Sequence, residues 1–232
     1  AKKTMPNVLF RIFIIDHNSG NEDLKKIDNQ LIVSKIPYKI INLNISEFEN
    51  KIKKINEKNE KVGKNMFTTM SSIYKSFLLA KESCNDLIYF VEDDYIHKNN
   101  SIEEMIFTYE KLSTLFNNEL FLCPIDYPYL YNEPNKTNVL IGNKFHWRRV
   151  DQTLCTFLTS SHMIRKYYDK LVSMCELEHN PFEKPLHEIY KKEYCFSPIP
   201  SLAVHFTNIN SAYGISPNTN LDKLWKENEF KN

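Results

Sequence analysis

The chain has 232 residues, 42% of them hydrophobic, and 30 Lys and Arg stand against 29 Asp and Glu. This composition is sufficient for a sizeable core in one domain, and a formal charge of +1 argues against wrapping nucleic acid or coating an anionic membrane. Only four glycines occur, where average usage gives roughly sixteen, and neither GxGxxG nor GxxxxGK(S/T) is present. These absences disfavour dinucleotide sites and P-loops, so a phosphorylated ligand would have to be neutralised by other means.

The predicted elements of the first half alternate between strands and helices. Short apolar runs predict strands over residues 8–15, 38–43, 87–91 and 120–123. Helices are predicted after Gly20, from a capping box at Ser46 to about Lys61, over 65–80, and from a second capping box at Ser101 to Phe116. The run at 87–91 is almost continuously apolar, which is typical of a parallel strand covered on both faces.

Residues 124–149 are rich in turns and aromatic side chains and are expected to be irregular. The remaining elements are predicted as a strand at 154–158, helices at 163–172 and 185–192, an extended segment at 194–206, and a tail with a helical turn near 221–225. This order favours an α/β protein, and the chain shows no repeat or linker, so one domain over residues 1–232 is expected.

The sequence carries little indication of a membrane span or of a disulfide framework. No apolar run approaches the ~20 residues that cross a bilayer, and the first residues lack the apolar stretch of a signal peptide. The five cysteines are far apart and include no CxxC pair, which favours reduced thiols over a disulfide framework or a zinc site. We therefore expect a cytoplasmic protein without a membrane span, although one free thiol beside two disulfides remains an alternative.

Three adjacent carboxylates, Glu92, Asp93 and Asp94, follow the predicted strand at 87–91. Neighbouring carboxylates repel one another and lose solvation, and a divalent cation relieves both costs. Mg²⁺ and Mn²⁺ take oxygen ligands and usually keep positions open for phosphate oxygens. Ligands in open α/β sheets bind beyond the carboxyl ends of the strands, so the triplet favours a metal site. The alternative is a solvated acidic turn that caps the next helix.

The segment Phe90-Val91-Glu92-Asp93-Asp94-Tyr95 resembles the acidic signature of GT-A glycosyltransferases. Three further stretches resemble a subgroup of bacterial and large-virus members of that family, among them viral enzymes that attach rhamnose. The stretches are Pro124–Tyr131, the pair His146–Arg148 and Thr153–Phe157, and Ser197–His205. Together these motifs span most of the chain.

The resemblance implies a GT-A fold, with a single Rossmann-like mixed sheet flanked by helices. A nucleotide-sugar-binding half would comprise about residues 1–123 and an acceptor-binding half about 124–232. The metal, Mn²⁺ or Mg²⁺, would be held by Asp94 and His205. The alternative interpretation of His205 is a histidine of the core. The donor would be contacted by three acidic residues, which are Asp16, Glu92 and Asp93.

Arg148 is expected beside the diphosphate, because a guanidinium suits bidentate contact with phosphate, and Trp147 is expected next to it. The alternative is an arginine that packs on the tryptophan. Three tyrosines, Tyr127, Tyr129 and Tyr131, are candidates for an acceptor-sugar face, with ordinary packing as the alternative.

An inverting transfer needs a base that takes the proton of the acceptor hydroxyl. The resemblance locates this base at Glu188, near the start of a helix before the final strand. Asp126, Asp151 and Glu183 are rivals, and Glu188 as a solvated helix residue remains open.

The sequence therefore predicts a metal-dependent, inverting glycosyltransferase. It would move a hexosyl or deoxyhexosyl group from a nucleotide-diphosphate donor, UDP-sugar favoured, to a glycan or glycoconjugate hydroxyl. Its expected location is a bacterial or virus-infected host cytoplasm. A retaining reaction and a non-catalytic glycan-binding module remain alternatives. A nucleotidyltransferase is less favoured, because the Asp16–Gly20 turn lacks the glycine-rich basic loop of that class.

Overall fold

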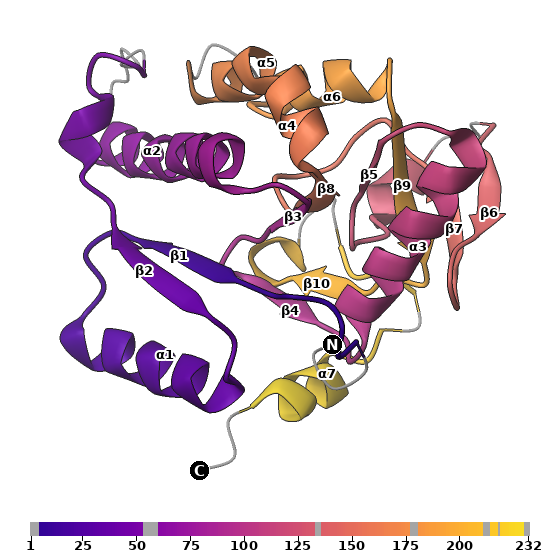
Figure 1. Cartoon of the computed structure of the whole chain (residues 1–232), viewed down its shortest axis with the longest axis horizontal. Helices are drawn as coiled ribbons and strands as arrows, with labels where there is room; N and C mark the ends of the chain where they lie inside the picture. Colours follow the sequence, from indigo (N-terminus) through magenta and orange to yellow (C-terminus); the bar gives the residue numbers. More distant parts are fainter. Residues whose placement is uncertain are drawn as a thin grey trace. The chain divides into compact units, whose positions relative to one another are not determined.

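The computed structural model describes residues 5–52, 60–132, 136–176, 181–210, 214–217 and 219–229 (Figure 1). The chain forms two compact units, one of Cys84–Lys166 and Leu186–Asn232, the other of Lys2–Ser83 and Tyr167–Pro185. The two units interleave along the chain, so their boundaries differ from the expected division near residue 123. The expectation of a single domain stays a prediction.

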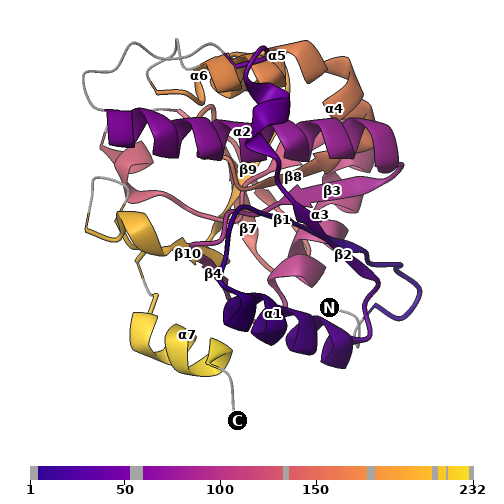
Figure 2. The ribbon, with the colours of Figure 1, turned by 90° about the vertical axis from the view of Figure 1, so that its left-hand side faces the viewer.

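The unit of Lys2–Ser83 and Tyr167–Pro185 is built on two parallel strands. Strands β1 (Ile12–Asp16) and β2 (Tyr38–Asn42) are connected through α1 (Asn21–Ser34), as in a right-handed crossover unit. Figures 1 and 2 show the pair lying between α1 and α2 (Glu60–Ser83). The core of this unit contains Leu43, Phe48, Ile52, Met70 and Cys175.

The other unit contains a six-stranded mixed sheet in the order β3-β8-β5-β9-β7-β6. Its strands are β3 (Leu87–Phe90), β5 (Leu120–Leu122), β6 (Val139–Ile141), β7 (His146–Arg149), β8 (Phe157–Ser160) and β9 (Tyr194–Ile199). Strands β5 and β9 are parallel, and every other neighbouring pair within this sheet is antiparallel. The prediction of a parallel strand at 87–91 is therefore wrong, because β3 lies at the sheet edge and pairs with β8 in the antiparallel sense.

One face of this sheet packs on α3 (Ser101–Phe116), where Met105 and Leu112 join Leu122, Trp147 and Phe196 in the core. Side chains alternate between the two faces of a strand, so Arg148 lies on the face opposite to its neighbour Trp147. On that opposite face the Tyr190 ring packs against Phe121, with ring centroids 5.2 Å apart.

A separate antiparallel pair is formed by β4 (Tyr95–His97) and β10 (Ala203–His205). The strands of the described residues thus fall into three sheets, where the sequence predicted a single one. The turn at residues 91–94 separates β4 from β3 and allows β4 to pair elsewhere. Helix α7 (Leu221–Asn228) lies beside β4, and the Asn228 amide donates to the His97 carbonyl oxygen.

Residues 124–149, predicted to be irregular, contain the β6–β7 hairpin and a 3-10 helix at Pro128–Tyr131. The predicted helix at 163–172 is divided into α4 (Ser161–Lys166) and α5 (Tyr168–Val172), and the one at 185–192 is α6 (Lys184–Tyr190). Further 3-10 turns occupy Ile45–Phe48, Ser173–Glu176 and Phe206–Asn208.

Both predicted capping boxes are wrong. Asn44 caps the short 3-10 helix by accepting from the Ser46 backbone, and part of the helix expected there, residues 53–59, lies outside the described residues. Helix α3 has Asn100 as its N-cap residue, and the Ser101 hydroxyl lies 2.7 Å from the Leu202 carbonyl oxygen instead. The hydroxyl also lies 2.6 Å from the Lys98 carbonyl oxygen, so it is engaged outside the first turn of α3.

None of the described helices is long and apolar enough to cross a bilayer. None of the five cysteines is in a disulfide, in agreement with the predicted reduced thiols.

Candidate functional site

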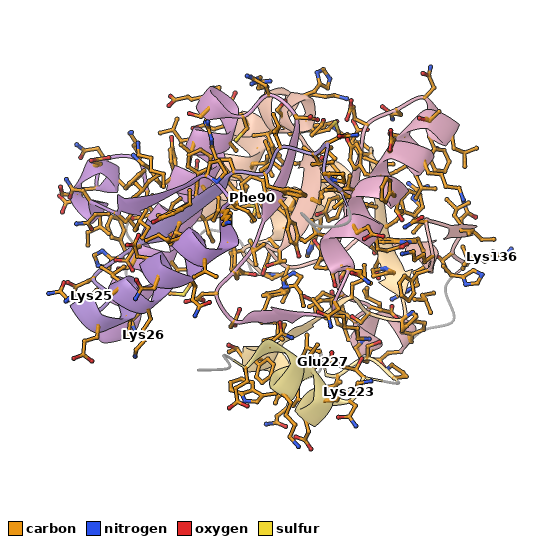
Figure 3. The ribbon with its side chains drawn as sticks, turned by 60° about the horizontal axis from the view of Figure 1, so that its bottom comes forward. Lys25, Lys26, Phe90, Lys136, Lys223 and Glu227 are labelled. Atoms are coloured by element: carbon orange, nitrogen blue, oxygen red, sulfur yellow. The ribbon has the colours of Figure 1, made fainter. Side chains whose placement is uncertain are left out.

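The acidic triplet forms a turn directly after β3, whose last residue, Phe90, is labelled in Figure 3. Glu92 is half-buried and held by Thr156: its backbone N–H donates to Thr156 Oγ1 at 3.1 Å, and that hydroxyl lies 3.3 Å from Glu92 Oε2. Asp93 is exposed, whereas the Asp94 side chain is 28% exposed and contacts the segment after β10. The three carboxylates therefore have different surroundings.

Asp94 and His205 meet although they are far apart in sequence. His205 Nε2 donates to Asp94 Oδ2 at 2.7 Å, and the Thr207 hydroxyl donates to the same oxygen. The pairing of β4 with β10 creates this contact, because it places His205 opposite Tyr95. The Phe206 N–H donates to the Asp94 carbonyl oxygen at 2.9 Å and fixes the two segments further. Thr207, which the sequence placed in a tail, is a member that sequence analysis missed.

The donor set of this cluster is one carboxylate, one imidazole and one hydroxyl. Mg²⁺ is often bound through one or two carboxylates together with waters and substrate phosphates, and imidazole suits transition metals such as Mn²⁺. In the ranges that the structure describes, no group of three or more His, Cys, Asp and Glu could hold a metal ion. A cation held by Asp94 and His205 would therefore take its remaining ligands from water or from an anionic ligand, and this cation site stays a prediction.

Two buried tyrosines support His205. The Tyr95 ring is stacked on the imidazole, with centroids 4.5 Å apart and planes at 16°, and its hydroxyl lies 2.9 Å from that of Tyr127. Burial raises the pKa of both phenols, so both remain neutral. Tyr127 is buried in the core around Ile125, which favours packing over the expected contact with an acceptor sugar.

Asp126 is buried in an ion pair with Arg148, whose Nε donates to Asp126 Oδ1 at 2.9 Å. The Tyr131 hydroxyl lies 2.9 and 2.8 Å from the two oxygens of the same carboxylate. These bonds occupy the carboxylate and argue against the predicted role of Asp126 as base. They also neutralise the charge of Arg148, which weakens the expectation that this guanidinium faces a diphosphate.

Trp147 is 0% exposed, and its indole N–H donates to Glu104 at 3.1 Å. This burial favours the core over the predicted contact with a nucleotide sugar. The neighbouring Arg149 is exposed and lies over the Tyr194 ring, 5.0 Å from its centroid.

The remaining candidate bases lie in different surroundings. Glu188 on α6 is ion-paired with Lys191 at 2.6 Å, and Asp151 is exposed in the loop before β8. Burial lowers the pKa of His187, and the Thr153 carbonyl oxygen, Asp151 and Glu188 oppose that shift. Both carboxylates therefore lie around this imidazole and remain candidates for the base.

Two candidates belong to the unit of β1 and β2. Burial raises the pKa of Glu183, and the Asp16 carboxylate accepts a hydrogen bond from the Ser19 hydroxyl. A site shared by either residue with Asp94 stays a prediction.

A polar hollow of about 510 Å³ lies away from these candidates, and its lining contains none of them. Lys223 and Glu227 of α7, both labelled in Figure 3, form an exposed ion pair at 3.9 Å on its edge. The lining residues are Asn99, Asn220, Asp222, Lys223, Lys226 and Glu227.

No protein-family model matches this chain, and no curated protein matches its sequence. The resemblance to GT-A enzymes therefore rests on the motifs alone.

Proposed function

We propose that this protein is a metal-dependent glycosyltransferase, which moves a sugar from a nucleotide-diphosphate donor to a glycan hydroxyl with inversion. The observation that carries the proposal is the contact of Asp94 with His205 at 2.7 Å, just beyond the end of β3. Two motifs that resemble the same family thus lie side by side. The GT-A fold and a cytoplasmic location are parts of the same proposal.

The residues of the cluster have separable roles in this proposal. Asp94 and His205 would hold the cation, with His205 Nε2 giving up the proton that it now donates to Asp94, and the Thr207 hydroxyl and the Phe206 N–H orient the Asp94 side chain and backbone. A Mn²⁺ or Mg²⁺ ion bound there supplies charge neutralisation for the diphosphate and its departure. Glu92, whose backbone N–H donates to Thr156, and the exposed Asp93 are proposed to contact the donor.

The base is proposed to be Glu188 or Asp151, because Asp126 is occupied by Arg148 and Tyr131. An acceptor hydroxyl loses its proton as it attacks the anomeric carbon, and the carboxylate accepts that proton. To act as the base, Glu188 would have to break its ion pair with Lys191, whereas Asp151 is already exposed.

The experiment is a hydrolysis and thermal-shift screen over nucleotide sugars, with and without Mn²⁺. A true donor stabilises the folded state by mass action, about 2.7 kcal/mol at a concentration a hundred times Kd. Asp94→Ala should reduce metal-dependent hydrolysis at least about 100-fold, since it removes a charged ligand of the metal. Glu110→Ala, an exposed residue of α3, is the matched control. Full metal-dependent hydrolysis in Asp94→Ala contradicts the proposal.

A glycan-binding module without catalysis is the second candidate, and it is favoured by the small number of protein ligands around Asp94 among the described residues. This module would bind glycans without metal or nucleotide. Calorimetric titration of a glycan with and without Mn²⁺ and nucleotide separates the two functions.

A further inference from the structure

Two buried polar atoms in the unit of the six-stranded sheet lack a hydrogen-bond partner among the described residues, and they belong to residues that face each other on neighbouring strands. These atoms are Nη2 of Arg148 and Oγ of Ser197. The residues are 5% and 1% exposed. Buried donors and acceptors in native proteins are nearly always paired, so each exception calls for an explanation such as a bound group.

Strand register brings the two atoms together. Arg148 on β7 is directly opposite Ser197 on β9 in an antiparallel pair. Directly opposed residues project from the same face of the sheet with Cβ atoms about 4.5–5.5 Å apart. A guanidinium N–H, which only donates, and a hydroxyl, which donates and accepts, are therefore available on one face.

The charge around these atoms selects the kind of ligand. Asp126 already compensates Arg148 through a bond of 2.9 Å, so the pair is neutral as a whole. An anion placed at Nη2 would face the Asp126 carboxylate at short range and be repelled. A neutral oxygen that both accepts and donates, such as a sugar hydroxyl, satisfies the two atoms without this repulsion.

An aromatic ring completes the chemistry for a sugar. The Tyr131 ring lies over the guanidinium, with Arg148 Cζ 4.0 Å from its centroid, and Tyr131 is 51% exposed. Because Nη2 is buried, a ligand would reach it only if this surface side chain moved aside. The Tyr131 ring would then offer an apolar face to the C–H groups of a sugar.

We propose that Arg148, Ser197 and Tyr131 form a subsite for a sugar ring, in which a sugar hydroxyl bonds to Arg148 Nη2 and Ser197 Oγ. The identification of that sugar as the acceptor glycan rests on the proposed function. Sugar binding itself depends on neither metal nor nucleotide.

Saturation-transfer NMR with methyl glycosides of glucose, galactose, mannose and rhamnose tests the subsite, without metal or nucleotide. At least one glycoside should receive saturation from the wild-type protein, and Ser197→Ala should reduce that transfer at least about 3-fold. The melting temperature of Ser197→Ala should not fall, because the substitution removes an unpaired buried hydroxyl. A binding loss with undiminished stability distinguishes a ligand contact from a structural role.

Ser216→Ala is the matched control, since Ser216 Oγ is a second buried hydroxyl without a partner among the described residues. This variant should bind the glycoside as the wild-type protein does. Tyr131→Phe keeps the ring and should retain binding, whereas Tyr131→Ala should lose it.

Unchanged saturation transfer in Ser197→Ala overturns the subsite, as does the absence of transfer for all four glycosides with the wild-type protein. Asp94→Ala separates this result from the proposed function. It should keep glycoside binding while losing metal-dependent hydrolysis of the donor. If Asp94→Ala loses activity while Ser197→Ala binds the glycoside as the wild-type protein does, the subsite is contradicted and the proposed function is not.

Discussion

Two carboxylates of the same unit, Glu104 and Asp94, have opposite surroundings. Glu104 is 2% exposed and accepts from the backbone of Asn143 and Lys144 and from the Trp147 indole, at 3.2, 2.8 and 3.1 Å. Asp94 is partly exposed and contacts a histidine and a hydroxyl through one oxygen.

The difference separates a structural carboxylate from a candidate functional one. The donors around Glu104 come from the β6–β7 turn and the core, so its negative charge holds the hairpin to α3. The second oxygen of Asp94 is not part of its contacts with His205 and Thr207. The number and origin of the hydrogen-bond donors around a carboxylate therefore say more about its role than its place in a sequence motif does.

Glu104→Ala should have the largest effect on folding. The substitution leaves several buried N–H donors without an acceptor, and we expect a loss of about 4 kcal/mol in the free energy of unfolding. Urea denaturation followed by circular dichroism measures it. Glu110→Ala, exposed on the same helix, should change the stability by less than about 0.5 kcal/mol. Similar losses of unfolding free energy in Glu104→Ala and Glu110→Ala would show that Glu104 is not a structural carboxylate, and its contrast with Asp94 would then fail.

The strand that follows Asp94 should be sensitive to acid. Burial lowers the pKa of His97 from 6.5 to about 4, and its Nε2 lies 2.5 Å from the Tyr89 hydroxyl. Between these pH values the unfolded chain takes up a proton that the folded protein does not, so stability falls as pH decreases from 6.5 to 4. A tenfold change in proton affinity is worth about 1.4 kcal/mol, which gives a loss of up to about 3 kcal/mol across this range.

Urea denaturation at a series of pH values measures this loss, with His97→Gln as the comparison. The variant should show a shallower decline between pH 6.5 and 4, because that proton uptake is absent. A decline of equal slope in both proteins would assign the acid sensitivity to other groups, among them His187.

Gly142→Ala should destabilise the hairpin that Glu104 holds. A Cβ at Gly142 would overlap Trp147 Cδ1 and Thr108 Oγ1, closer than any normal contact. We expect a loss of about 2 kcal/mol from overpacking, measured by thermal or urea unfolding. At Gly20, the N-cap residue of α1, an added Cβ has its nearest neighbour at 3.6 Å, so Gly20→Ala should lose only the smaller N-cap preference for glycine. Equal losses in both variants would contradict the close packing inferred at this turn.

The sequence predicted the elements whose signal is local. Helices α1, α2 and α3 follow their apolar periodicity, and β1, β2 and β5 follow short apolar runs. The β6–β7 hairpin escaped prediction because Glu104, distant in sequence, supplies the acceptors for its turn. The capping box at Ser101 failed because the hydroxyl is engaged by the carbonyl oxygens of nearby Lys98 and distant Leu202, not by the backbone of the first helical turn.

The sequence likewise indicated some residues of the candidate site and missed others. The acidic triplet and His205 were found from motifs, and the pairing of β4 with β10 brings two of these residues together. The sequence could not show that Asp126 and Arg148 form an ion pair, because a pair between residues distant in the chain leaves no periodic signal. Thr207 lacked any local signal, since a single hydroxyl acquires a role only through its neighbours in space, and the motif that contains Ser197 gave no role to that residue.

The most direct test of the account is Mn²⁺ binding to the wild-type protein and to Asp94→Asn, measured from the free-ion signal in electron paramagnetic resonance, with and without UDP. Asp94→Asn preserves the shape of the side chain and removes its charge. We expect the wild-type protein to bind Mn²⁺ more tightly in the presence of UDP, and Asp94→Asn to bind it at least about 10-fold more weakly. Equal Mn²⁺ affinity in the two proteins would contradict a cation site at Asp94.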